Sequence, residues 1–201
     1  MSNTTPALSA HRQPTTATGL DSAKLGMWLF LATEVMLFSA MIAGFLDMRG
    51  RSPADANHVL NIPVTAVNTF ILICSSLTVA LSVASIEQGD QKGLRTFLLL
   101  TMLFGGTFLS VQIYEYNVLI SSGELTPWNS LFGAGFFAVT GLHGFHVFIG
   151  LIWCALTILW ATQGKFSAQN FSRVEIFGLY WHFVDVVWII LFVGQSRLIL
   201  F

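Results

Sequence analysis

The sequence contains very few charged residues. Of its 201 residues only 9% are Asp, Glu, Lys or Arg, against roughly 25% in an ordinary soluble domain. Hydrophobic residues make up 54% of the chain, and they include 18 Phe and 6 Trp. A soluble domain of this size could not cover its surface with so few charges. The composition therefore excludes an ordinary soluble protein and predicts a protein embedded in a bilayer.

Cysteine motifs and an excess of charge of one sign are also missing. Cys74 and Cys154 lie far apart in apolar stretches, without CxxC or CxxCH spacing. We interpret both as buried thiols that pack as small hydrophobic side chains. The formal net charge is −1 and there is no basic tail, so nucleic acid is not expected as a partner.

The first 24 residues are polar and rich in Thr, Ser and Ala, with Arg12 and Lys24 as their only fixed positive charges. They lack a short apolar core followed by a small-residue cleavage site, which excludes a cleaved signal peptide. We expect residues 1–24 to be a flexible tail.

Five apolar segments follow, each long enough to cross a hydrocarbon core of ~30 Å as a helix. They run approximately over residues 25–46, 64–86, 94–119, 131–161 and 176–201. The stretches between them, such as EQGDQKG and SSGELTPWN, have the composition of loops. The sequence therefore predicts an all-α fold, a single domain over residues 25–201 built as a bundle of five transmembrane helices.

The distribution of Lys and Arg predicts the orientation of this bundle. With the N-terminus inside and the C-terminus outside, six basic residues fall on the inner side and three on the outer side. The inner residues are Arg12, Lys24, Lys92, Arg95, Lys165 and Arg173, and the outer residues are Arg49, Arg51 and Arg197. An excess of basic residues marks the cytoplasmic side, so we expect the N-in, C-out orientation.

Ionisable side chains inside the predicted spans are informative, because a charge at the centre of a membrane helix costs about 2.5–3.5 kcal/mol and normally faces a protein interior. The spans contain Glu34, Glu115, His143, His146, His182 and Asp185. Four of these, on three different spans, fall at similar depth in the inner half, whereas Glu115 lies near an outer helix end and His143 lies one turn from His146. We expect a structural hydrogen bond at Glu115.

The stretch TGLHGFHVFIG, residues 140–150, places His143 and His146 three apart on one side of a helix. From the residues alone three interpretations remain open: a hydrogen-bonded structural network, a metal or haem site, and a proton or ion path. A di-iron bundle would need several carboxylates that converge on one centre, and a haem pair would use His146 and His182 from different helices. The structural network is the interpretation we favour.

A stripe of small residues lies on the same helix. Ala134, Ala138 and Gly141 follow i, i+4, i+7 spacing, a pattern that lets membrane helices approach closely. The two histidines project from roughly the opposite side. We therefore expect protein to cover both faces of the helix.

Three longer stretches carry a resemblance to a known family. WLFLATEVMLFS, VQIYEYNVLISSGELTPWNSLFGAGFFAVTGLHGFHVFIGL and FGLYWHFVDVVWIILF occur in this order, and they resemble the signature stretches of subunit III of the haem-copper respiratory oxidases. The resemblance extends from the first span to the C-terminus. The chain resembles the short bacterial form, which lacks the first two of the seven helices of longer members.

The resemblance implies an accessory, non-catalytic subunit with no metal and no redox centre of its own. Haem and copper are then expected in the neighbouring catalytic subunits, which reduce oxygen to water and pump protons. The implied partners are subunit I in direct contact, subunit II, small subunits and bound phospholipid, in a bacterial cytoplasmic membrane. Glu34 matches a buried acidic position of the family, for which we favour a proton-related role over packing alone.

The alternatives concern the complex to which such a chain belongs. We favour cytochrome c oxidase over a quinol oxidase, and an accessory protein of nitric oxide reductase shares the short form. An independent proton or ion transporter is the alternative from a different class. A transporter would need polar side chains across the whole membrane and is often built from inverted repeats, whereas the polar residues here gather in the inner half.

Overall fold

The computed structural model describes residues 21–51, 62–123, 125–128 and 130–195. This part of the chain folds into five helices, α1 (Ser22–Arg51), α2 (Ile62–Glu87), α3 (Gln91–Ser122), α4 (Leu131–Thr162) and α5 (Ser172–Gln195). Each is long and apolar enough to cross a membrane. Helices suit these segments because backbone groups in hydrocarbon must be satisfied within the segment itself. The prediction of an all-α bundle with five spans is confirmed.

Four helices begin earlier than predicted: α1 by three residues, α2 by two, α3 by three and α5 by four. The Asp21 carboxyl accepts a hydrogen bond from the Ala23 backbone N–H at 3.1 Å, so the first turn of α1 is capped and starts at Ser22. The assignment of residues 22–24 to the tail was therefore wrong, and the expected flexibility of residues 1–20 lies outside the described residues. Helix α5 begins at Ser172, four residues before its predicted start, while the predicted end at residue 201 is not among the described residues.

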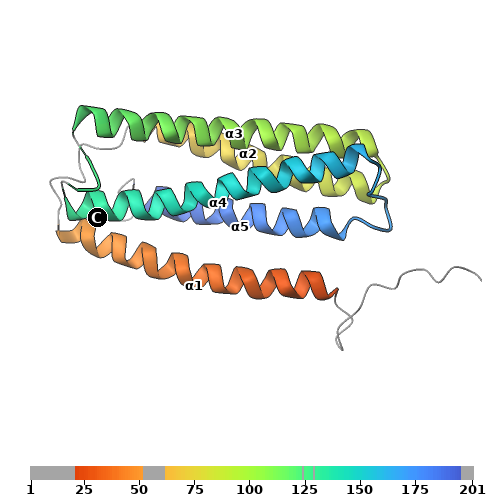
Figure 1. Ribbon diagram of the computed structural model, residues 1–201, viewed down its shortest axis with the longest axis horizontal. Helices are drawn as coiled ribbons and strands as arrows, with labels where there is room; N and C mark the ends of the chain where they lie inside the picture. The colour runs from red at the N-terminus through yellow and green to blue at the C-terminus, as the bar shows by residue number, and fades with distance from the viewer. Residues whose placement is uncertain (1–20, 52–61, 124, 129, 196–201) are drawn as a thin grey trace, which may run out of the picture.

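Figure 1 shows α4 and α5 in the middle of the bundle, with the α2–α3 pair on one side and α1 on the other. The starts of α1 and α5, the α2–α3 turn and the end of α4 share one end of the bundle, called here the Lys24 end. The other end, where α1 finishes, is called the Arg49 end. The Asp90 carboxyl accepts from the Lys92 backbone N–H at 3.0 Å and caps α3 at the Lys24 end.

Close packing in the centre depends on two glycines. The Trp181 indole of α5 is fully buried and lies between α3 and α4. A Cβ atom added at Gly105 would lie 2.7 Å from the indole, and one added at Gly150 would lie 2.8 Å from it. The indole N–H donates to the Ser75 hydroxyl of α2 at 2.9 Å. One tryptophan thus joins four helices, and any larger side chain at either glycine would displace it.

Helix α1 is the least buried of the five. In the most apolar 18-residue stretch of α1 only 17% of the residues are buried within the chain, against 56% in the corresponding stretch of α5. It packs on α4 towards the Arg49 end, where the Phe45 and Phe132 rings lie 5.5 Å apart. Two grooves lie beside it: one of about 650 Å³ between α1 and α5, and one of about 460 Å³ among α1, α2 and α5 at the Lys24 end.

Candidate functional site

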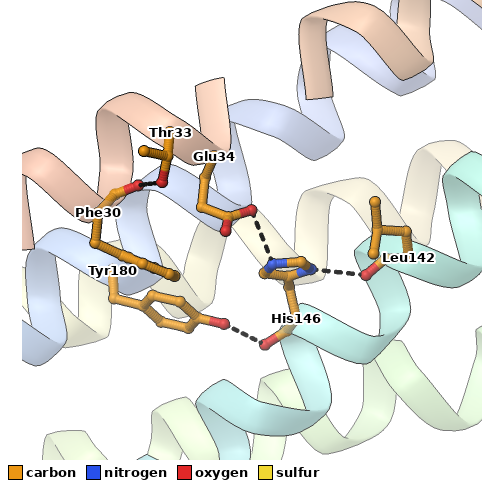
Figure 2. Close-up of polar contacts among 6 residues, drawn as sticks. All are labelled: Phe30, Thr33, Glu34, Leu142, His146 and Tyr180. Atoms are coloured by element: carbon orange, nitrogen blue, oxygen red, sulfur yellow. Dashed lines mark hydrogen bonds and ion pairs between the residues drawn. The ribbon is translucent and has the colours of Figure 1, made fainter. Parts of the chain in front are cut away.

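The main polar contact inside the spans joins α1 to α4. The Glu34 Oε2 atom lies 3.2 Å from the His146 Nε2 atom, and the two side chains are only 14% and 9% exposed. Figure 2 shows the carboxyl of α1 facing the imidazole of α4 across the gap between the two helices. Both residues were predicted to lie at similar depth, and the structure brings them into contact.

The hydrogen bonds of His146 define where its protons lie. Its Nδ1 atom is 2.9 Å from the Leu142 carbonyl oxygen. A carbonyl only accepts hydrogen bonds, so Nδ1 must carry a proton. Nε2 then faces the Glu34 Oε2 atom at ion-pair distance, although among the described residues this oxygen completes no hydrogen bond.

Aromatic residues hold His146 in place. The Tyr180 hydroxyl of α5 donates to the His146 backbone carbonyl at 2.9 Å, and the Phe38 ring meets the imidazole edge-on at a centroid distance of 5.1 Å. Phe30 stacks on Tyr180 at 6.4 Å, as Figure 2 shows. The ion pair therefore has contacts from α1, α4 and α5 around it, which restricts the rotation of the imidazole.

His182 and Asp185 do not join this pair. The His182 Nδ1 atom lies 2.6 Å from the Ser76 hydroxyl of α2, so the histidine pairs with a neighbouring helix rather than with the aspartate. Asp185 is 4% exposed, and within the described ranges neither of its carboxyl oxygens has a hydrogen-bond partner. Of the four residues predicted at one depth, Glu34 and His146 contact each other, whereas His182 and Asp185 join neither this pair nor one another among the described contacts.

The two histidines of the HxxH stretch face different surroundings. His143 is fully buried, and no described residue forms a hydrogen bond with either of its ring nitrogens. It stacks on Trp188 at a centroid distance of 4.9 Å and meets the edge of Phe108 at 5.9 Å. His146 instead faces α1. Within the described part of the chain, no three His, Cys, Asp or Glu residues converge in a way that could hold a metal ion.

Glu115 and the small-residue stripe lie away from these contacts. The Thr65 hydroxyl of α2 donates to the Glu115 Oε1 atom at 3.2 Å, which ties α2 to α3. Ala138 is exposed and Ala134 is half-buried. A Cβ atom at Gly141 would meet only the Tyr116 hydroxyl, at 4.0 Å. The stripe therefore faces away from the tightly packed interior of the chain.

Two contacts at the Lys24 end tie the starts of α1 and α5 together, and sequence reasoning missed both. Lys24 Nζ lies 2.6 Å from Glu175 Oε2, and the Ser172 hydroxyl donates to the Asp21 carboxyl at 2.6 Å. The hydrogen bond from Ser172, followed by that from the Ala23 backbone, lowers the pKa of Asp21. About 150 residues separate the partners in sequence, and no periodicity of the chain relates them.

Comparisons with known proteins show the family to which the chain is similar. A family model described as cytochrome c oxidase subunit III matches residues 5–196. A cytochrome c oxidase subunit 3 from Corynebacterium diphtheriae is 37% identical over 178 residues, which cover 86% of each chain. The same subunit from Thermostichus vulcanus is 36% identical over 188 residues, or 91% of this chain and 88% of the relative.

A quinol oxidase subunit 3 from Bacillus subtilis is 33% identical over 172 residues, or 85% of this chain and 84% of the relative. Relatives named after both electron donors thus span nearly the same length of sequence, and the five apolar helices described above agree with a subunit that lies in a membrane. The chain belongs to the cytochrome c oxidase subunit III family and is subunit III of a haem-copper terminal oxidase.

Proposed function

We propose that this subunit supports proton uptake by the catalytic subunit of its oxidase, and that the Glu34–His146 pair is the group through which it does so. The observation that carries the proposal is the pair itself, an acid and a base 3.2 Å apart and nearly buried between two helices. An ionisable residue inside a membrane span is costly, is normally paired, and is by default a candidate for a functional site such as a proton relay. The pair would hold a proton near the catalytic subunit during turnover.

The surroundings of the subunit follow from the same proposal. The Lys24 end is the cytoplasmic end, because it carries Lys24, Lys92, Arg95, Lys165 and Arg173. The membrane is the bacterial cytoplasmic membrane. Subunit I is the direct partner, with subunit II and small subunits in the same complex, and the haems and copper lie in those partner chains. The stripe of Ala134, Ala138 and Gly141, which is half-buried at its two ends and exposed at Ala138, is a surface on which a helix of subunit I could pack closely.

Bound phospholipid is part of this proposal. The larger groove beside α1 is lined almost entirely by apolar side chains, among them Leu31, Val35 and Phe183. At the Lys24 end the second groove reaches Lys24 and Glu175. An acyl chain fits the chemistry of the first groove, and a headgroup fits the charged residues at the mouth of the second. Lipid extraction of the purified complex followed by mass spectrometry, with Val35→Trp to fill the groove, tests this part.

For the electron donor we propose cytochrome c, with quinol as the second candidate because close relatives carry that name. Purification of the complex in mild detergent separates the two. Oxygen consumption with reduced cytochrome c supports the first candidate, and oxygen consumption only with quinol supports the second. A colourless subunit that transports ions alone would overturn the oxidase assignment itself.

The test of the proton-related role uses three variants in reconstituted vesicles. Glu34→Gln keeps shape and hydrogen bonding but removes the titratable group, so we expect normal assembly and an initial rate close to that of the unmodified oxidase. Its activity should then decay faster over sustained turnover, or proton pumping per electron should fall. Glu34→Ala should also weaken assembly, since it leaves a void and an unpaired imidazole.

The matched control is Thr33→Val on the neighbouring residue. The Thr33 hydroxyl donates only to the Phe30 carbonyl of its own helix, so its loss should change neither lifetime nor pumping. If Glu34→Gln equals the unmodified oxidase in initial rate, lifetime and pumping, Glu34 is a packing residue and the proposal fails.

A further inference from the structure

Three buried polar side chains in the interior of the bundle have hydrogen-bonding atoms that no described residue satisfies. These atoms are Oδ1 of Asn68 on α2, Oε1 of Gln112 on α3 and both ring nitrogens of His143 on α4. The three residues are 1%, 4% and 0% exposed. Lipid tails offer no hydrogen bonds, and buried polar atoms are nearly always paired with protein or with ordered water. The proposed function uses none of these three side chains.

The three residues converge on one turn of α3. The Asn68 side-chain N–H donates to the Phe108 backbone carbonyl at 3.3 Å. The His143 ring meets the Phe108 ring at a centroid distance of 5.9 Å, with the two planes nearly perpendicular. Gln112 follows Phe108 by four residues, which places both side chains on the same face of α3. The unsatisfied atoms therefore come from three helices that meet around Phe108.

A second contact between α3 and α4 closes this region towards the Arg49 end. The Tyr116 hydroxyl donates to the Thr140 hydroxyl. On α3 this contact lies one turn beyond Gln112, and on α4 it lies one turn before His143. Because α3 and α4 run in opposite directions (Figure 1), Gln112 lies between this hydrogen bond and the ring contact described above. Its amide is thus enclosed between the same two helices, which agrees with its low exposure.

Aromatic packing holds the imidazole of His143 in place. The Trp188 ring of α5 stacks on His143 at a centroid distance of 4.9 Å and meets Phe108 at 4.8 Å. The Trp188 indole N–H donates to the Thr69 hydroxyl of α2 at 3.0 Å, which fixes the indole itself. Since these contacts restrict rotation of the imidazole, a partner for its nitrogens must be small enough to reach them where they are.

The hydrogen-bonding capacity of the four atoms does not allow them to satisfy one another. Amide oxygens only accept hydrogen bonds, and a neutral imidazole, the form favoured in apolar surroundings, has one donor and one acceptor. The set therefore consists of three acceptors and a single donor. A water molecule is small and supplies two donors and two acceptors. Proteins hold on the order of one buried water per 27 residues, typically on polar groups that otherwise have no partner.

We propose that Asn68, Gln112 and His143 form a binding site for water inside the membrane-spanning bundle. One water molecule donates to Asn68 Oδ1 and Gln112 Oε1 and accepts from the N–H of His143. A second water molecule donates to the other ring nitrogen. The bound water joins α2, α3 and α4 around Phe108. No residue of the site belongs to the ion pair of the proposed function, so the two proposals stand or fall independently.

The experiment is hydroxyl-radical labelling of the purified oxidase complex by brief X-ray irradiation, with the oxidised residues located by mass spectrometry. Irradiation splits bound water into radicals that oxidise the side chains beside it, even where bulk solvent does not reach. Phe108 and Phe177 are both 0% exposed, and Phe177 packs against the Trp153 and Trp181 rings. We expect Phe108 to be labelled several-fold faster than Phe177. Equal rates in the unmodified complex would overturn the proposal.

Two variants of α3 assign the water to these residues. Gln112→Leu removes one acceptor at similar volume and should lower the labelling of Phe108 to that of Phe177. Gln91→Leu is the matched control, because Gln91 also has a buried side-chain oxygen but lies in the first turn of α3; it should leave Phe108 labelling unchanged. Equal labelling of Phe108 in the two variants would overturn the assignment. If Gln112→Leu does not assemble, Asn68→Leu makes the same test from α2.

A structure of the complex at a resolution that shows ordered water provides a second measurement. We expect density for water within hydrogen-bond distance of Asn68, Gln112 and His143. Density for a different molecule, or side chains that have turned to bond directly to one another, would overturn the proposal.

Discussion

The contact between Glu34 and His146 makes a quantitative prediction about how α1 is held. At the observed separation of 3.2 Å, two opposite unit charges attract by about 5 kcal/mol in an effective dielectric of about 20. The cost of removing both from water offsets most of this attraction, so the intact pair adds little net stability. Removal of one partner strands the other, and for a buried pair this costs about 3–5 kcal/mol.

The prediction is a coupling energy rather than a single loss. We expect Glu34→Ala and His146→Ala each to lower the free energy of unfolding of the subunit. The decrease in the double variant should be smaller than the sum of the two single decreases by at least about 1 kcal/mol. A coupling well above about 2 kcal/mol, the upper end of the range for hydrogen bonds between membrane helices, would indicate an ion pair. A smaller coupling within that range would indicate the neutral acid and imidazole.

The assay is reversible unfolding of the purified subunit in mixed micelles with increasing SDS, followed by circular dichroism. Thr33→Ala combined with His146→Ala is the control cycle, because the Thr33 hydroxyl bonds within its own helix, and its coupling should be close to zero. If the Glu34–His146 cycle gives no more coupling than this control, the two side chains do not interact in the membrane subunit and the reasoning above is refuted.

Three further predictions concern packing, metals and pH. Gly150→Leu should unfold the subunit, because even a Cβ atom there would lie 2.8 Å from a buried indole. Gly141→Leu should leave the subunit folded but reduce its yield in the complex on native gels. Equal complex yields for Gly141→Leu and Leu142→Ile would exclude the stripe as an interface. After chelator washing, elemental analysis of the isolated subunit should find no stoichiometric iron, copper or zinc, and one equivalent that His146→Ala removes would contradict the structural interpretation of the histidines. The hydrogen bonds of Asp21 lower its pKa below the ordinary value of 3.8. They therefore stabilise the fold at pH values above 3.8, and this stabilisation is lost as the pH falls through the lowered pKa. The free energy of unfolding, measured against pH, should show this loss in the unmodified chain and not in Asp21→Asn.

The number, type and approximate extent of the helices could be predicted because the bilayer imposes them. A run of about twenty apolar residues has few alternatives to a spanning helix. The helix starts were less predictable because capping decides them. Asp21 caps α1 through a local hydrogen bond to Ala23, and α5 begins a full turn before its apolar run because Ser172 and Glu175 make contacts with the start of α1.

The set of buried ionisable residues could also be predicted, but not how its members pair. The periodicity of the sequence indicates which face of a helix a residue occupies, but it does not indicate which other helix covers that face. Glu34 and His146 lie 112 positions apart, and Ser76 was not a candidate at all, because serine is common in membrane helices and its partner His182 is 106 residues away. The same limit applies to the contact of Gly150 with the central indole, which depends on the crossing of three helices.

The attachment of α1 shows why polar contacts matter in this subunit. In a bilayer the hydrophobic effect does not drive helices together, so packing and polar contacts must do so. Helix α1 packs little against the other helices, since only 17% of its most apolar 18-residue stretch is buried. It nevertheless makes polar contacts at three positions along its length. Lys24 meets Glu175 at one end, Glu34 meets His146 in the middle, and the buried Arg49 guanidinium donates to a backbone carbonyl of α5 at the other end. Three contacts spaced along one helix determine both its depth and its rotation, since a slide or a turn of α1 would break all of them together. The central contact is the one furthest from water, and its coupling energy is therefore the most direct measure of how firmly α1 is held.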